Sequence, residues 1–291
     1  MKIFIAIPTY NRAQVLSLCI KFFLSSKLIN GFIVVAQATT SKEAEKYANV
    51  LKELRDSGFE VLHQITNTRL GSAGARNRLI EIAVATLAKS DIFIMYDDDF
   101  VYPGDYTIKS ILGWLNFSSV GMVGGKVINL RRRRIDPDFA LNIDNLADKL
   151  TEISGFILLN TIHGPRVANY TSHPFASRVE TLQKGIRYDE NYQGTGYREE
   201  SDLQRQIKAI GLKIIYEPRF FAYHLAVETG GNRYSDLQDR MYWKWKNHTY
   251  FMNKWHYPTS KKILSYVILT TYALLNGPPA IRGIMKAVKN R

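Results

Sequence analysis

The chain has 291 residues, of which 46% are hydrophobic, so it can bury a sizeable core and extensive disorder is excluded. Its formal net charge of +13 favours negatively charged partners such as nucleotides, anionic lipid head groups or nucleic acid. Cys19 is the single cysteine and lies in an apolar run, which excludes a disulfide framework and predicts a buried thiol.

The first 125 residues alternate between short apolar segments and amphipathic ones. The apolar segments predict buried strands at 2–8, 32–36, 60–65, 91–96 and 120–125. The amphipathic segments predict helices at 13–24, 41–58, 72–89 and 106–115. Such alternation is typical of an α/β fold with a mixed, mainly parallel sheet flanked by helices, which binds its ligands at the carboxyl ends of the strands.

The pattern becomes weak after residue 125 and returns near residue 196. A solvated turn is predicted at 131–139 and a short helix at 142–150, in a region that we expect to face the substrate. An amphipathic helix follows at 196–211, then a strand at 211–218 and a helix at 235–255.

Three consecutive aspartates, Asp97, Asp98 and Asp99, follow the apolar segment 91–96. Adjacent carboxylates repel one another unless a cation lies between them. If the strand continues, Asp97 and Asp99 point to the same side, and their oxygens suit Mg²⁺ or Mn²⁺. The alternative is an aspartate-rich turn without a metal, because turns favour aspartate.

Four motifs resemble those of family 2 glycosyltransferases with the GT-A fold. They are IAIPTYNR (5–12), LGSAGARN (70–77), YDDDFVYP (96–103) and REESDL (198–203). Each motif alone is weak, but their order and spacing together are specific, and the resemblance covers roughly residues 1–255.

The resemblance implies a divalent metal and a nucleotide sugar. Asp97 and Asp99 match the D-x-D motif, which in this family holds Mn²⁺ or Mg²⁺ and, through the metal, the diphosphate of the donor. Asp98 takes the middle position and is expected to contact ribose or sugar hydroxyls. His224 matches the place of a third metal ligand in some members, although a lone histidine is more often structural.

The late acidic motif carries the expected general base. Glu200 matches the acidic residue that, in inverting members, takes the proton of the acceptor hydroxyl, and Glu199 is its rival because the motif reads Glu-Glu here. The alternative is that Glu199, Glu200 and Asp202 only stabilise the amino end of a helix.

The resemblance also implies a set of residues around the nucleotide. They are Pro8, Thr9, Tyr10, Arg12, Gly71, Arg76 and Asn77. Ala36 stands where the family carries a base-reading aspartate, so Gln37 is expected to contact the base, and UDP, GDP and TDP donors all stay open. Ordinary helix capping by Ser72 is the alternative for the turn. His163 and His173 are candidates for binding acceptor or phosphate, although a surface role is favoured for each.

The C-terminal segment is basic and aromatic, followed by an apolar run. The run at 263–275 is shorter than the roughly 20 residues that a membrane span needs. Mixed aromatic and basic residues at 242–262 favour peripheral membrane contact, and the alternative is a helical pair that packs on the catalytic domain. Nucleic acid is disfavoured, because the aspartates would repel phosphates unless a metal intervened.

These inferences combine into one predicted enzyme. Residues 1–230 form the GT-A domain, with 1–125 binding the nucleotide sugar and 126–230 the acceptor, and 231–291 form a helical extension. The predicted activity is metal-dependent, inverting transfer of a hexose to a hydroxyl of a glycan or lipid-linked acceptor, in the cytoplasm or at the inner face of the cell membrane. The alternatives are a sugar-1-phosphate nucleotidyltransferase, although its glycine-rich loop is missing from the sequence, and a non-catalytic module that binds membranes or nucleic acid.

Overall fold

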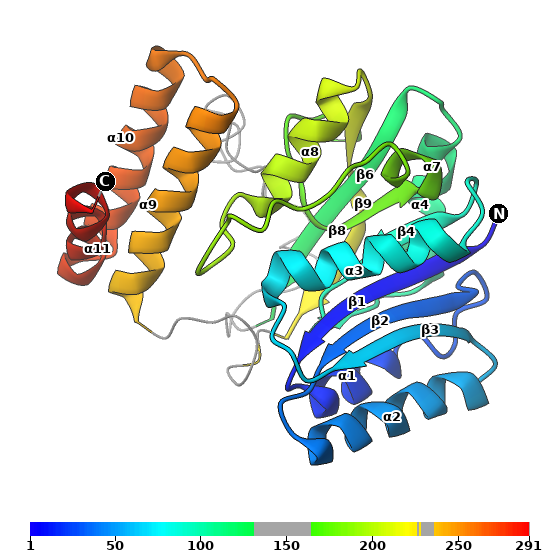
Figure 1. Cartoon of the computed structure of the whole chain (residues 1–291). Helices are drawn as coiled ribbons and strands as arrows, with labels where there is room; N and C mark the ends of the chain where they lie inside the picture. Colours follow the sequence, from blue (N-terminus) through cyan, green and yellow to red (C-terminus); the bar gives the residue numbers. More distant parts are fainter. Residues whose placement is uncertain (131–163, 226, 228–235, 291) are drawn as a thin grey trace.

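The computed structural model describes residues 1–130, 164–225, 227 and 236–290. Within these residues the centre is a nine-stranded mixed sheet with the order β3-β2-β1-β4-β8-β6-β9-β5, with β7 paired to β9 (Figure 1). The strands are β1 (Ile3–Tyr10), β2 (Gly31–Gln37), β3 (Glu60–Thr66), β4 (Ile92–Met95), β5 (Phe100–Val101), β6 (Val120–Asn129), β7 (Arg166–Val167), β8 (Ser172–Arg178) and β9 (Lys213–His224). The predicted turn at 131–139, the predicted helix at 142–150 and His163 lie outside the described residues.

Helices cover both faces of the sheet, which explains why its central strands are apolar on both sides. The helices before the C-terminal segment are α1 (Ala13–Ile20), α2 (Ser41–Asp56), α3 (Gly71–Thr86), α4 (Asp105–Leu115), α7 (Val179–Leu182) and α8 (Glu199–Ala209). On β1, Ile3, Ile5 and Ile7 pack in the core under α1, α2 and α4. Phe4 and Ala6 point to the opposite core, under α3, α7 and α8. The strand period of two therefore supplies both layers.

The predicted α/β fold class is confirmed, and so are the five early strands and the four early helices. β1, β2, β3 and β4 pair in parallel. β8 runs antiparallel to both β4 and β6, so the sheet contains more antiparallel pairing than the sequence predicts. Cys19 is buried, as predicted.

Three helices form the C-terminal segment: α9 (Leu237–Lys254), α10 (Thr259–Leu275) and α11 (Pro278–Lys289). They share an apolar cluster that includes Trp245, Leu269 and Ile284. They are also tied to the part of the chain that forms the sheet, since the buried Asp202 of α8 accepts hydrogen bonds from Trp255 Nε1 at 2.7 Å and from Lys254 Nζ at 2.9 Å. Among the described helices, none combines the length and the apolar composition that crossing a bilayer requires.

Candidate functional site

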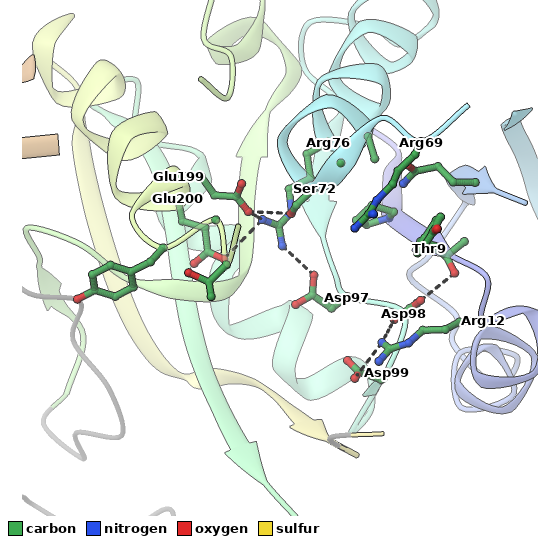
Figure 2. A pocket seen from close by; sticks show the side chains of 18 of the residues that line it. Thr9, Arg12, Arg69, Ser72, Arg76, Asp97, Asp98, Asp99, Glu199 and Glu200 are labelled. Carbon is green, nitrogen blue, oxygen red and sulfur yellow. Dashed lines mark hydrogen bonds and ion pairs between the residues drawn. The ribbon is translucent and has the colours of Figure 1, made fainter. Parts of the chain in front are cut away.

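A cleft of about 420 Å³ opens where β1 and β4 end, between the starts of α3 and α8 (Figure 2). This volume lies within the range of small-molecule sites, and the position is where α/β sheets bind ligands. The predicted site residues that line it are Pro8, Thr9, Tyr10, Arg12, Gln37, Gly71, Arg76, Asp97, Asp98, Asp99, Glu199, Glu200 and His224. Motifs separated by up to two hundred residues in the sequence therefore meet in one cavity.

Asn77 is the predicted nucleotide residue that does not line this cleft. Its side-chain amide donates to Tyr188 O at 3.0 Å and to Glu190 Oε1 at 2.9 Å, and its carbonyl accepts from Tyr188 N at 2.8 Å. One residue along a helix turns the side chain by about 100°, so Arg76 faces the cleft and Asn77 faces the loop after α7. The structure thus gives Asn77 a structural role.

One side of the cleft is formed by a group of residues that we call the Arg12 cluster: Thr9, Arg12, Asp98, Asp99 and His224. Arg12 Nη1 lies 3.0 Å from Asp98 Oδ1 and 3.4 Å from Asp99 Oδ2, and all three side chains are buried. Thr9 Oγ1 donates to Asp98 Oδ2 at 2.8 Å. Asp98 is therefore held from two directions inside the protein, and burial raises the pKa of its carboxyl to about 6 in spite of the nearby Arg12.

His224 and Asp99 lie side by side in the Arg12 cluster. β5 pairs with β9 so that Phe100 is opposite His224, and His224 Nε2 comes within 3.2 Å of Asp99 Oδ2. A carboxylate and an imidazole are ligands that Mn²⁺ accepts, and such sites often complete their coordination with substrate phosphates. The carboxylate of Asp99 and the imidazole of His224 are therefore chemically suited to hold the divalent metal that the family resemblance implies.

Asp97 lies apart from that pair, because β4 ends at Met95 and a turn follows, with Phe100 N donating to Asp97 O at 3.2 Å. The side chain of Asp97 is 31% exposed and contacts Arg76 Nη2 at 3.1 Å. Accordingly, no group of three or more His, Cys, Asp or Glu side chains among the described residues is already arranged around a metal position.

Arg76 organises the opposite side of the cleft, together with Ser72, Asp97, Glu199 and Glu200 (Figure 2). It pairs with the buried carboxylate of Glu199, whose Oε1 also accepts from Ser72 Oγ at 2.7 Å. Arg76 Nη1 lies 3.7 Å from Glu200 Oε1. Although burial opposes its charge, the carboxylates raise the pKa of Arg76 above its ordinary value, so this guanidinium stays charged.

The two adjacent glutamates differ in environment. Burial raises the pKa of Glu199 above its ordinary value, although Arg76 and Ser72 act against that rise. Burial also acts on Glu200, but the neighbouring His173 and Arg76 outweigh it and lower the pKa of Glu200. The Glu200 side chain is 22% exposed, against 6% for Glu199, so Glu200 is the ionised carboxylate that a ligand in the cleft can reach.

His173 is buried beneath this side of the cleft, so the prediction of a surface role was wrong. It is 3% exposed and belongs to β8, a strand that the sequence pattern did not reveal. Its Nδ1 lies 2.9 Å from Glu200 Oε1 and 3.9 Å from Asp97 Oδ2. The histidine therefore joins the late acidic motif to the first aspartate.

Several lining residues were missed by sequence reasoning. Arg69 lies at the cleft with its guanidinium 5.3 Å from the centre of the Tyr10 ring. The loop Thr195–Gly196–Tyr197–Arg198 also lines the cleft. The two glycines in Gln-Gly-Thr-Gly-Tyr were a usable signal, because Gly194 and Gly196 both take positive φ angles, 63° and 64°.

Gln37 lines the cleft but already has a partner. Its side-chain oxygen accepts a hydrogen bond from Leu70 N at 2.6 Å, which connects the end of β2 to the turn before α3. The amide nitrogen is the group left for a ligand in this arrangement. Contact with a nucleobase stays a prediction.

A cleft at the carboxyl ends of the strands, lined by carboxylates and arginines, is the position where α/β enzymes bind small ligands. The family model described as "Glycosyl transferase family 2" matches residues 4–152. The chain therefore belongs to glycosyl transferase family 2, and it is a glycosyltransferase.

Solved structures show the same GT-A fold. A mannosyltransferase of Pyrobaculum calidifontis, in complex with GDP-Man and Mn²⁺, is 14% identical with a TM-score of 0.61, over 99% of this chain and 74% of that one. A mycobacterial protein is 14% identical with a TM-score of 0.53, over 89% and 76%. GalNAc-T7, with UDP, GalNAc and Mn²⁺, is 14% identical with a TM-score of 0.57, over 84% and 47%. No curated protein gave a significant match.

Proposed function

We propose that the protein transfers a hexose from a nucleoside-diphosphate sugar to a hydroxyl acceptor, with inversion and with the help of a divalent metal. The observation that carries this proposal is the division of one cleft into two sides. The Arg12 cluster offers carboxylate and imidazole ligands, and the opposite side offers an accessible, ionised Glu200 held by His173.

The donor is proposed to lie along the Arg12 cluster. The metal, Mn²⁺ or Mg²⁺, would be held by Asp99 and His224 of the Arg12 cluster and by Asp97 from the opposite side of the cleft, and when bound it neutralises charge on the leaving nucleoside diphosphate. Pro8, Thr9, Tyr10 and Gln37 border the nucleotide in this arrangement. Two of the structural relatives are described as complexes with GDP-Man or UDP and with Mn²⁺, which supports a donor and metal of the same kind here.

Glu200 is proposed as the general base. The acceptor oxygen forms a bond to the anomeric carbon while the bond from that carbon to the diphosphate breaks, and the hydroxyl proton passes to Glu200. His173, 2.9 Å from Glu200 Oε1, positions the carboxylate. Glu199 is less suited to the role, because it is committed to Arg76 and Ser72 inside the protein.

The acceptor is proposed to be a glycan or a lipid-linked molecule, with peripheral membrane contact through α10. Ser265, Leu269 and Ala273 pack inward, whereas the other side of the helix leaves apolar side chains exposed. Those side chains are Ile263, Leu264, Val267, Leu274 and Leu275. From Arg240 to the end, the sequence has ten Lys or Arg residues and no Asp or Glu, which suits an anionic lipid surface. Placement at the inner face of the cell membrane stays a prediction.

The donor proposal is tested by thermal unfolding with UDP, GDP, TDP and their common sugars, each with and without Mn²⁺. A ligand present at 100 times its Kd should stabilise the folded state by about 2.7 kcal/mol. We expect one nucleotide to raise the melting temperature only when Mn²⁺ is present, and that nucleotide identifies the base. If no nucleotide shifts the melting temperature with or without metal, the proposed donor site is wrong.

A further inference from the structure

A second pocket is lined by the C-terminal half of α8 and by the turn that joins α9 to α10. Its volume is about 230 Å³, space for several water molecules. Its polar and aromatic lining includes the side chains of Asn169, Arg205, Lys208, Trp255, Tyr257 and Lys261. It shares no lining residue with the catalytic cleft, so it is a separate site.

Three cations surround this pocket, and among the described residues none of them has a carboxylate partner. Within the described parts of the chain, none of Arg205, Lys208 and Lys261 forms an ion pair. Lys208 Nζ donates to Asn169 Oδ1 at 2.8 Å, which is a neutral acceptor. Arg205 packs over the Trp255 ring at 5.5 Å, and its Nε atom is buried with no hydrogen-bond partner.

The carboxylate of Asp202, which contacts Trp255 of the pocket, is already engaged elsewhere. Asp202 accepts from Trp255 Nε1 at 2.7 Å and pairs with Lys254 at 2.8 Å, so it balances a different lysine. Consistent with a surplus of positive charge, burial and then the charges of Arg205 and Lys261 lower the pKa of Lys208. Like charges held together are unfavourable, and a bound anion would relieve their repulsion.

We propose that this pocket binds a phosphate group. A guanidinium gives a planar fork of donors that matches phosphate oxygens, and two ammonium groups add charge from other directions. Lys261 lies in the first turn of α10, and the exposed Ile263 and Leu264 follow after Lys262. A phosphate held here would therefore lie at the end of the apolar face of α10, which favours a phospholipid head group over a soluble phosphate ester.

The test uses the full chain labelled with 5-fluorotryptophan and observed by ¹⁹F NMR. The sequence has four tryptophans, and Trp255→Phe identifies the resonance of the one at the pocket. Inorganic phosphate is titrated into the parent protein, into Lys208→Gln/Lys261→Gln, and into the control Lys42→Gln/Lys52→Gln. The control removes the same charge from two exposed positions on α2, away from the C-terminal segment.

We expect phosphate to shift the Trp255 resonance saturably, with a Kd that rises about tenfold or more in the pocket variant and is unchanged in the control. A Trp255 resonance that does not respond to phosphate, or equal weakening in both variants, overturns the proposal. Because Lys261 is exposed, Lys261→Gln alone gives the same test if the double variant does not fold.

Vesicles distinguish the two sources of phosphate. Binding to phosphatidylcholine vesicles with and without phosphatidylglycerol is compared for the same three proteins. If the pocket variant loses the binding that depends on phosphatidylglycerol and the control keeps it, the phosphate belongs to a lipid head group. If vesicle binding is equal while the phosphate titration differs, the ligand is a soluble phosphate ester.

Discussion

The two sides of the cleft use the same residue types in different ways. Arg12 faces Asp98 and Asp99, and the pKa of Asp98 is raised to about 6 by burial. Arg76 faces Glu199, Asp97 and Glu200, and its own pKa is raised by them. The Arg12 cluster thus contains Asp99 and His224, whose carboxylate and imidazole are ligands that a divalent metal accepts. On the opposite side, Arg76 holds Glu199 in a buried ion pair, and Glu200 is the more exposed of the two glutamates, 22% against 6%.

The largest expected effect is on turnover and comes from replacing Glu200, the more exposed glutamate beside Arg76. Glu200→Gln should lower kcat by about 10²–10⁴-fold, because a positioned general base contributes that much. The melting temperature should change little, since Glu200 is partly exposed and not the main partner of Arg76. Steady-state kinetics with a saturating donor provide the measurement, with Glu45→Gln on the exposed face of α2 as the control. A variant with full turnover would exclude Glu200 as the base.

The next effect concerns folding stability, and it compares the two arginines directly. Arg76→Met leaves the buried Glu199 without its cation, and breaking a buried pair in this way lowers the free energy of unfolding by about 3–5 kcal/mol. Arg12→Met should lower it less, because the pKa of Asp98, about 6 with Arg12 in place, rises further without that cation, so the carboxyl takes up a proton near neutral pH instead of staying charged. Urea unfolding at pH 7 measures both. Equal losses would mean that the two clusters are not energetically different.

The pH dependence of kcat can show whether Glu200 or Glu199 is the general base, because their pKa values are shifted in opposite directions. A general base must be deprotonated, so activity is lost as the pH falls through its pKa. The pKa of Glu200 lies below the ordinary value of 4.5 because of His173 and Arg76, in spite of burial. Burial places the pKa of Glu199 above 4.5. We therefore expect the acidic limb of the kcat profile below pH 4.5, and a limb above that value would assign the base to Glu199.

The sequence predicted the first four strands more accurately than the rest of the fold. Each of β1, β2 and β4 is a continuous apolar run buried on both faces, and amphipathic helices lie between them. The ends of those strands are also where the motifs lie, so most of the cleft followed from local patterns and the family resemblance. Local patterns are sufficient for this part of the cleft, because the carboxyl ends of parallel strands meet at the same edge of the sheet.

The rest depended on contacts that no local pattern encodes. β8 reads Ser-His-Pro-Phe-Ala-Ser-Arg, and it is a strand because Ala176 lies between Ile94 of β4 and Val123 of β6. His173 is buried beside Glu200 for that reason alone. Likewise, Lys208 and Lys261 are far apart in the sequence and become neighbours only through the turn after α9.

The division of the cleft is tested most directly by calorimetric titration of the nucleotide that the melting panel selects. It is titrated with and without Mn²⁺ into the parent protein, Asp99→Asn and Glu200→Gln. We expect Mn²⁺ to tighten nucleotide binding in the parent and in Glu200→Gln alike, and Asp99→Asn to lose about tenfold or more of that gain. Equal behaviour of the two variants, or binding in the parent that does not depend on Mn²⁺, would contradict a metal-bound donor on the Arg12 side.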